Sequence, residues 1–265
     1  MVRLNLYGLA KEARNPEDFL ERLLPEAAEE ISNYMDQRVR FIVDEADFFK
    51  LNFLAKEGLI DRDKFSAMFG MFGLAEGVNH LLNLEKAEDR FGHGKEANDY
   101  GLKIIDKLYK LVSDHKAPYC DSFGNKYLLH AQVGIESDNG TSPGCRIPIN
   151  EEPELFDHII QSAKFHKYFP SGIGDIFPFD EMAEKNPSAI RDVILASFKE
   201  GMRYFSIYGS DADVIRITGY LVKKSDMDRL YNQEQVLHDT VVLGLGAREN
   251  SRILERKVRS DESLS

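Results

Sequence analysis

The chain has 265 residues, of which 43% are apolar and 30% are charged, as in an ordinary soluble globular protein of one or two domains. Its net charge of -11 disfavours binding to nucleic acid or to anionic membranes, because an acidic surface repels both. No segment has the length and apolarity of a membrane span or an export signal, and two cysteines cannot form a disulfide framework, so we expect a cytoplasmic protein.

The first strong element is a helix that begins at Asn15 and Pro16. Asn is a good N-cap, Pro suits the first helical position, and the acidic Glu17 and Asp18 suit the positive end of the helix. The pattern continues to Gly58, which suits a helix C-terminus, and predicts one very long helix or two in succession. Apolar residues recur along it at steps of three and four: Phe19, Leu23, Ala27, Ile31, Tyr34 and Met35.

Two further apolar segments follow. Residues 65–84, FSAMFGMFGLAEGVNHLLNL, begin as a tightly packed buried segment that contains Gly70 and Gly73, and continue as a helix. A second helix is predicted over residues 96–114, where apolar residues share one face: Tyr100, Ile104, Ile105, Leu108 and Val112.

Residues 115–152 are rich in Gly, Pro, Asn, Asp and Ser, with one strand-like run at residues 127–133. Long irregular segments of this kind are usually functional loops or linkers. We expect its two cysteines, Cys120 and Cys145, to be more exposed than core cysteines usually are. Arg146 would favour a thiolate at Cys145, so this pair is a candidate pocket site, with an incidental cysteine as the alternative.

Acidic residues of the central loops form another candidate group. They could act as acid–base groups if they converge in a pocket, and solvated loop carboxylates are the alternative. These residues are Glu136, Asp138, Glu151, Glu152 and Asp175. The scattered histidines show no metal-binding spacing, so we expect no metal site.

The chain after residue 152 alternates between helices and loops. We expect a short helix over residues 157–169, a loop over residues 170–181, a strand over residues 204–208 and a charged helical tail. A helix that begins at Asn186 and Pro187 should bury one apolar face: Ile190, Val193, Ile194 and Phe198.

A glycine interrupts the apolar run at residues 214–226, VIRITGYLVKKSD. The order Arg216, aliphatic residue, Thr218, Gly219, Tyr220 resembles the signature of the glycyl radical enzymes, which carry their glycine near the C-terminus. A radical on an α-carbon is stabilised by the amide nitrogen on one side and the carbonyl on the other when the backbone is flat, and only glycine avoids a side-chain clash there. The alternative is a bulge glycine inside a strand.

Other segments support this resemblance. Residues 4–23 and 65–82 are similar to the region that follows the catalytic finger loop of anaerobic ribonucleotide reductases. Residues 137–159 and the glycine segment look most like the YjjI-type glycine radical proteins. The stretch before Gly219 lacks the Cys-x-x-Cys zinc pair of the reductases, which disfavours a ribonucleotide substrate.

The resemblance implies an α/β fold, the C-terminal half of a ten-stranded glycyl radical enzyme barrel. Residues 1–175 would form a helix-rich partial barrel, and residues 176–265 a glycyl radical domain with a charged tail. Gly219 would store the radical, supported by Arg216, Thr218 and Tyr220, with no tightly bound cofactor.

The resemblance also implies partners. A radical S-adenosylmethionine activase would install the radical under anaerobic conditions, because the product is oxygen-sensitive. The thiyl-forming cysteine of the family lies before the segment that Leu4 begins, so neither cysteine here inherits that role. We expect an N-terminal half or a second copy as partner, and a small-molecule substrate. The alternative is a non-catalytic remnant or a radical-carrying repair subunit.

Overall fold

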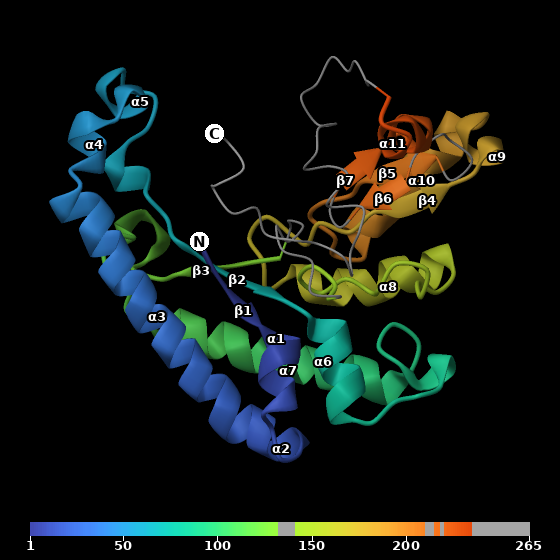
Figure 1. Cartoon of the computed structure of the whole chain (residues 1–265), viewed down its shortest axis with the longest axis horizontal. Helices are drawn as coiled ribbons and strands as arrows, with labels where there is room; N and C mark the ends of the chain where they lie inside the picture. Colours follow the sequence, from blue (N-terminus) through green and yellow to red (C-terminus); the bar gives the residue numbers. More distant parts are fainter. Residues whose placement is uncertain (132–140, 210–214, 218–219, 235–265) are drawn as a thin grey trace.

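The computed structural model describes residues 1–131, 141–209, 215–217 and 220–234 (Figure 1). Its main sheet has three parallel strands in the order β1 (Val2–Asn5), β2 (Met68–Phe72) and β3 (Leu128–His130). Helices fill both connections, as parallel pairing requires. The fold is therefore mixed α/β, as the family resemblance implies.

The connection from β1 to β2 is almost entirely helical. It contains α1 (Leu6–Lys11), α2 (Pro16–Asp18), a π-helical turn (Phe19–Leu23), α3 (Leu24–Arg40) and a second π-helical turn (Phe41–Glu45). The short helices α4 (Phe48–Leu51) and α5 (Phe53–Lys56) and a 3-10 turn (Arg62–Lys64) complete it. The predicted long helix thus runs from Pro16 to Glu45 and ends where Asp47 adopts a left-handed conformation, with φ of 46°.

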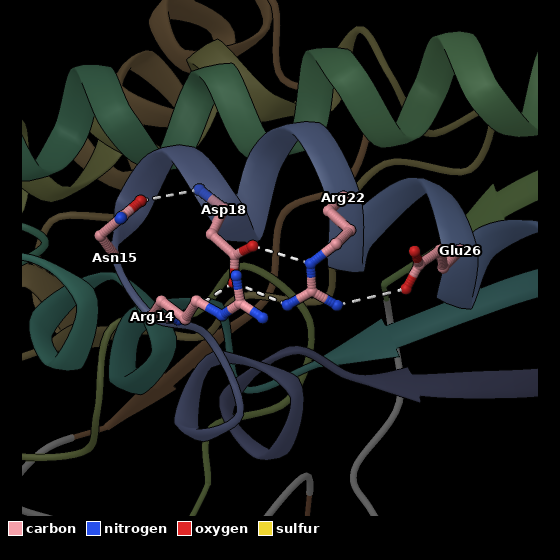
Figure 2. A network of polar contacts seen from close by, with 5 residues as sticks. All are labelled: Arg14, Asn15, Asp18, Arg22 and Glu26. Carbon is pink, nitrogen blue, oxygen red and sulfur yellow. Dashed lines mark hydrogen bonds and ion pairs between the residues drawn. The ribbon is translucent and has the colours of Figure 1, made fainter.

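The start of this helix is fixed by a polar network (Figure 2). The Asn15 side chain accepts a hydrogen bond from the Asp18 amide at 2.8 Å, which confirms the predicted N-cap. Asp18 in turn accepts from the Arg14 amide at 3.0 Å and from two nitrogens of Arg22 at 2.7 and 2.8 Å. These contacts hold the pKa of Asp18 at about 2, chiefly through the Arg22 hydrogen bonds. Arg22 also reaches Glu26 at 3.5 Å.

The buried face of the long helix differs in part from the predicted one. Phe19 and Met35 are buried as expected, but Tyr34 is 51% exposed. Further buried positions on this helix are Leu24, Ala28, Ser32 and Val39. Gly58 follows α5 with φ of 70°, as a helix C-terminus favours.

The connection from β2 to β3 contains α6 (Leu74–Leu81) and α7 (Lys95–Asp114), with 3-10 turns at Ala87–Asp89 and Asp121–Phe123. Helix α7 confirms the predicted helix and its apolar face. The predicted buried segment at residues 65–84 is strand β2 followed by α6.

The two faces of the main sheet carry different residues. In Figure 1 helices α3 and α7 lie on one side of the sheet. Side chains on that side belong to the large core of the molecule and are at most 6% exposed: Leu4, Phe69, Met71 and Leu129. Arg3 and His130 lie on the opposite face, where the paired residue of β2 is Gly70.

A second, smaller core lies around helix α8 (Leu155–His166). Strand β4 (Phe177–Phe179) pairs in parallel with β5 (Ile207–Gly209), and helices α9 (Glu181–Glu184) and α10 (Pro187–Lys199) lie between them in the chain. The segment predicted as a loop at residues 170–181 thus contains a strand. Phe198 of α10, predicted to be buried, is 47% exposed, and the buried residue of this helix is Ser197.

The last described elements are β6 (Ile215–Ile217), β7 (Tyr220–Val222) and α11 (Lys224–Tyr231). Strands β6 and β7 pair with each other in an antiparallel arrangement. Within the described residues, no helix is both long and apolar enough to cross a membrane.

Candidate functional site

The glycine segment is split between two paired strands. Ile217 of β6 lies opposite Tyr220 of β7, and Arg216 lies opposite Leu221. The apolar run is therefore two strands that pair with each other, which corrects the view of a single strand interrupted by a glycine. Thr218 and Gly219, between these strands, lie outside the described residues.

The loop that carries the cysteine candidate is buried at the end of β2. Pro143 forms a bridge with Phe72, and the Gly73 amide donates to the Ser142 carbonyl at 2.8 Å. All seven residues from 141 to 147 are buried. The loop therefore closes over the carboxyl end of a parallel strand, the edge at which open α/β sheets usually bind ligands.

Cys145 is not the exposed, activated thiol that the sequence predicts. It is 4% exposed, and burial raises its pKa well above the usual value, with the negative charge of Asp175 adding to the effect. Arg146 is also buried. Its positive charge helps to lower the pKa of Asp175, where the charge of His158 has a larger effect. Cys120, likewise predicted to be exposed, is fully buried, and burial raises its pKa too. Neither thiol is a ready nucleophile.

The charge that acts on Cys145 belongs to a buried acid–histidine pair. The Nε2 atom of His158 on α8 is 2.8 Å from Oδ2 of Asp175, and the Ile176 amide donates to Oδ1 at 2.9 Å. Burial opposes ionisation of Asp175, but the charge and hydrogen bond of His158 and the charge of Arg146 outweigh it and hold its pKa at about 2. The carboxylate is thus a fixed negative charge and a poor proton acceptor near neutral pH.

The structure does not bring the candidate carboxylates into one pocket. Glu151 pairs with Arg90 at 2.9 Å, and Glu152 accepts from the Asn150 amide at 2.7 Å, whereas Asp175 is enclosed beside His158. Glu136 and Asp138 lie outside the described residues.

Glu76 is a candidate that the sequence pattern did not single out. One oxygen accepts from the amide and the hydroxyl of Ser142 at 2.8 and 2.7 Å. Burial raises its pKa, although the Ser142 hydrogen bonds act in the opposite direction. Glu76 lies in the first turn of α6, directly after β2, and this position is the feature of the sequence that could have identified it. Among the described residues, no three His, Cys, Asp or Glu side chains gather as a metal site would require.

Solved structures of other proteins share the fold of this chain. An anaerobic ribonucleotide reductase of known structure is 14% identical and aligns over 90% of this chain and 43% of its own, with a TM-score of 0.63. The Thermotoga maritima reductase solved with dATP and CTP is 17% identical over 87% of this chain and 43% of its own, with a TM-score of 0.66. At these identities the likeness shows a shared fold.

Sequence comparison gives nearer relatives. A Haemophilus influenzae protein is 40% identical over 100% of this chain and 52% of its own length. The Escherichia coli K12 protein YjjI is 40% identical over 98% of this chain and 50% of its own. The chain therefore spans about half the length of the curated relatives it matches. The family model described as "Glycyl radical enzyme YjjI-like" matches residues 1–259. The chain belongs to the YjjI-like glycyl radical enzyme family.

Proposed function

We propose that this chain is the radical-bearing portion of a glycyl radical enzyme and that Gly219 stores the radical. The observation that carries the proposal is the signature RITGY in a chain of this family, whose flanking residues form the paired strands β6 and β7. Arg216, Thr218 and Tyr220 would support the radical loop.

The reaction would begin with a radical S-adenosylmethionine activase. The deoxyadenosyl radical that the activase generates would take one hydrogen atom from the α-carbon of Gly219, which yields deoxyadenosine and the glycyl radical. The glycyl radical would then take a hydrogen atom from a cysteine thiol and restore glycine. Both described cysteines are buried, and neither matches the family's thiyl position, so we assign this thiol to the other half of the enzyme.

The other half would also complete the barrel. We propose that residues 1–175 form a partial barrel and that residues 176–265 form the radical domain. The end of the large core at Ile173 supports this division. The small core combines Phe177, Phe179 and Met202 with residues of α8, so that helix would connect the two parts. Exposed apolar side chains on α8, α10 and β5 support a partner surface: Phe156, Ile160, Leu195, Phe198 and Ile207.

Electron paramagnetic resonance tests the radical. The chain, expressed anaerobically with its activase and with any N-terminal half encoded beside it, should give a doublet from the α-hydrogen of the glycyl radical. Gly219→Ala should abolish the signal, and oxygen should cleave the wild-type chain at residue 219. The control Gly58→Ala, where an added Cβ meets nothing within 4 Å, should keep the doublet. A wild-type chain that stays silent with an activase active on a full-length relative would refute the proposal.

A radical-carrying repair subunit is the second candidate, because the part of the relatives that this chain matches includes the glycine signature. Such a subunit would restore activity to a full-length relative that oxygen has cleaved at its glycine. Adding the activated chain to that damaged relative distinguishes the two: recovery of turnover indicates repair, and turnover only with an N-terminal half indicates a split enzyme.

A further inference from the structure

The face of the main sheet that lies away from α3 and α7 carries an unusual row of residues. Arg3, Gly70 and His130 are register partners on β1, β2 and β3, so they lie side by side across the sheet. Parallel sheets normally bear apolar residues on both faces. The opposite face of this sheet follows that rule, whereas this face combines the apolar Met68, Phe72 and Leu128 with a cation and an imidazole.

Gly70 has no side chain at the middle of this row, and the side chains of Arg3 and Met1 lie beside it. A Cβ there would lie 2.7 Å from Cγ of Arg3 and 3.2 Å from the Val2 carbonyl oxygen, so the Arg3 side chain leans across the glycine. A glycine inside a central strand often marks a place where a ligand approaches the backbone closely. Neighbouring strands are about 4.8 Å apart, so the α-carbons of Arg3 and His130 are roughly 10 Å from each other. Side chains of this length can both contact a small group bound between them.

His130 has an unsatisfied polar atom at this place. Its Nδ1 atom is buried and has no hydrogen-bond partner among the described residues. Burial lowers the pKa of His130, and the positive charges of Arg3 and of the N-terminal ammonium group lower it further. A buried ring nitrogen without a partner is costly, and a ligand oxygen would relieve that cost.

We propose that Arg3 and His130 bind an anionic oxygen group of a small-molecule substrate, a carboxylate or a phosphate, above Gly70. Arg3 supplies the charge and the forked donors that such groups favour, and His130 supplies a second donor from the other side. The five N–H groups of a guanidinium let Arg3 keep its contacts within the chain while it binds the anion. The proposal rests on the proposed function only in assigning the anion to a substrate.

Ligand titration followed by NMR tests the site without any radical. Histidine ring signals of the full chain are recorded while sodium acetate or inorganic phosphate replaces chloride at constant ionic strength, and His130→Gln identifies the His130 signal. We expect a saturable shift of that signal and a rise in its pKa, because the anion offsets the charge of Arg3. Arg3→Gln should weaken binding by about tenfold or more, the usual order for a lost charge-assisted contact.

The controls and outcomes separate this proposal from the radical one. Arg191→Gln removes an exposed arginine on α10 and should leave binding unchanged. Saturation by acetate identifies a carboxylate site, and saturation by phosphate a phosphate site. Shifts that never saturate, or that are equal in Arg3→Gln and wild type, overturn the proposal. Thermal unfolding of each variant checks that the fold is kept. Arg3→Lys retains the charge, so its affinity for the anion should lie between those of wild type and Arg3→Gln. A bound anion with no doublet at Gly219 would refute only the proposed function.

Discussion

His158 and Asp175 form a buried pair in which Nε2 and Oδ2 are 2.8 Å apart and both side chains are at most 4% exposed. The pair joins helix α8 to the segment that leads into β4. Asp175 also accepts from the hydroxyl of Ser162 at 3.3 Å, and its carbonyl accepts from the hydroxyl of Ser206 at 2.7 Å. Three separate parts of the chain therefore meet at one carboxylate residue.

Asp175→Ala should destabilise the fold by about 3–5 kcal/mol, the usual loss when one member of a buried pair is removed and its partner remains. Chemical denaturation of the full chain measures the change. The matched control is Asp228→Ala at an exposed position of α11, which should change stability by less than about 0.5 kcal/mol. Equal effects at the two positions would show that the buried pair has no special role.

The same carboxylate should make stability depend on pH in the acid range. Its pKa is held at about 2 in the folded chain and lies near 3.9 in an unfolded one, so the unfolded state binds the proton first as the pH falls. The stabilisation is present above about pH 4 and is lost between about pH 4 and pH 2. Urea midpoints of wild type and Asp175→Asn should therefore converge over that interval. A difference that stays constant down to pH 2 would contradict the assignment.

Both cysteines should resist alkylation in the folded chain. Cys120 and Cys145 are buried, and burial raises both pKa values, so little thiolate is present and reagents cannot reach it. Mass spectrometry after iodoacetamide treatment should show no adduct in buffer and two in denaturant. Ser188→Cys, at an exposed position of α10, supplies a thiol that should react in both conditions. Rapid labelling of native Cys145 would restore it as a reactive candidate.

Gly144→Ala should destabilise the chain more than Gly124→Ala. Both glycines are left-handed, with φ of 55° and 66°, so alanine costs about 1–2 kcal/mol at either position. An added Cβ at Gly144 would also lie 2.7 Å from the Ala131 carbonyl oxygen, whereas at Gly124 it meets nothing within 4 Å. Thermal denaturation of the two variants isolates the steric part, and equal melting temperatures would show that the buried loop can move aside.

Asn15→Ala should cost about 1 kcal/mol, because the Asp18 amide loses its capping acceptor. Asn33→Ala is the matched control at an exposed position within α3, where alanine is the better helix former and should be neutral or slightly stabilising. Helicity and unfolding free energy can be followed together by circular dichroism. A null effect at Asn15 would mean that Arg14, Asp18 and Arg22 suffice to fix the helix start.

The sequence pattern predicted those features of the fold that depend on interactions between residues close together in the chain. The cap at Asn15 and the apolar face of α7 follow from short-range rules, and the structure contains both. Strand β2 was not assigned because a short run that is apolar on all sides looks the same in a buried helix. Phe198 lies on the apolar face of α10 but is exposed. A helical period identifies such a face, but it does not show which part of the protein packs against it.

The site was less accessible to sequence reasoning. Gly219 emerged from a motif alone, and the structure does not describe it. The burial of Cys145 depends on the bridge between Phe72 and Pro143, which are far apart in sequence. Arg3 and His130 come together only through the register of three strands, which no local pattern specifies.

Helix α8 contributes to both cores of the molecule. Phe165 belongs to the large core, whereas Ile159 and Ala163 belong to the small one. Because one rigid helix is shared, neither core can open without exposing apolar surface of the other. The described parts should therefore melt in a single cooperative transition, and amide hydrogens of α8 should be among the last to exchange with solvent.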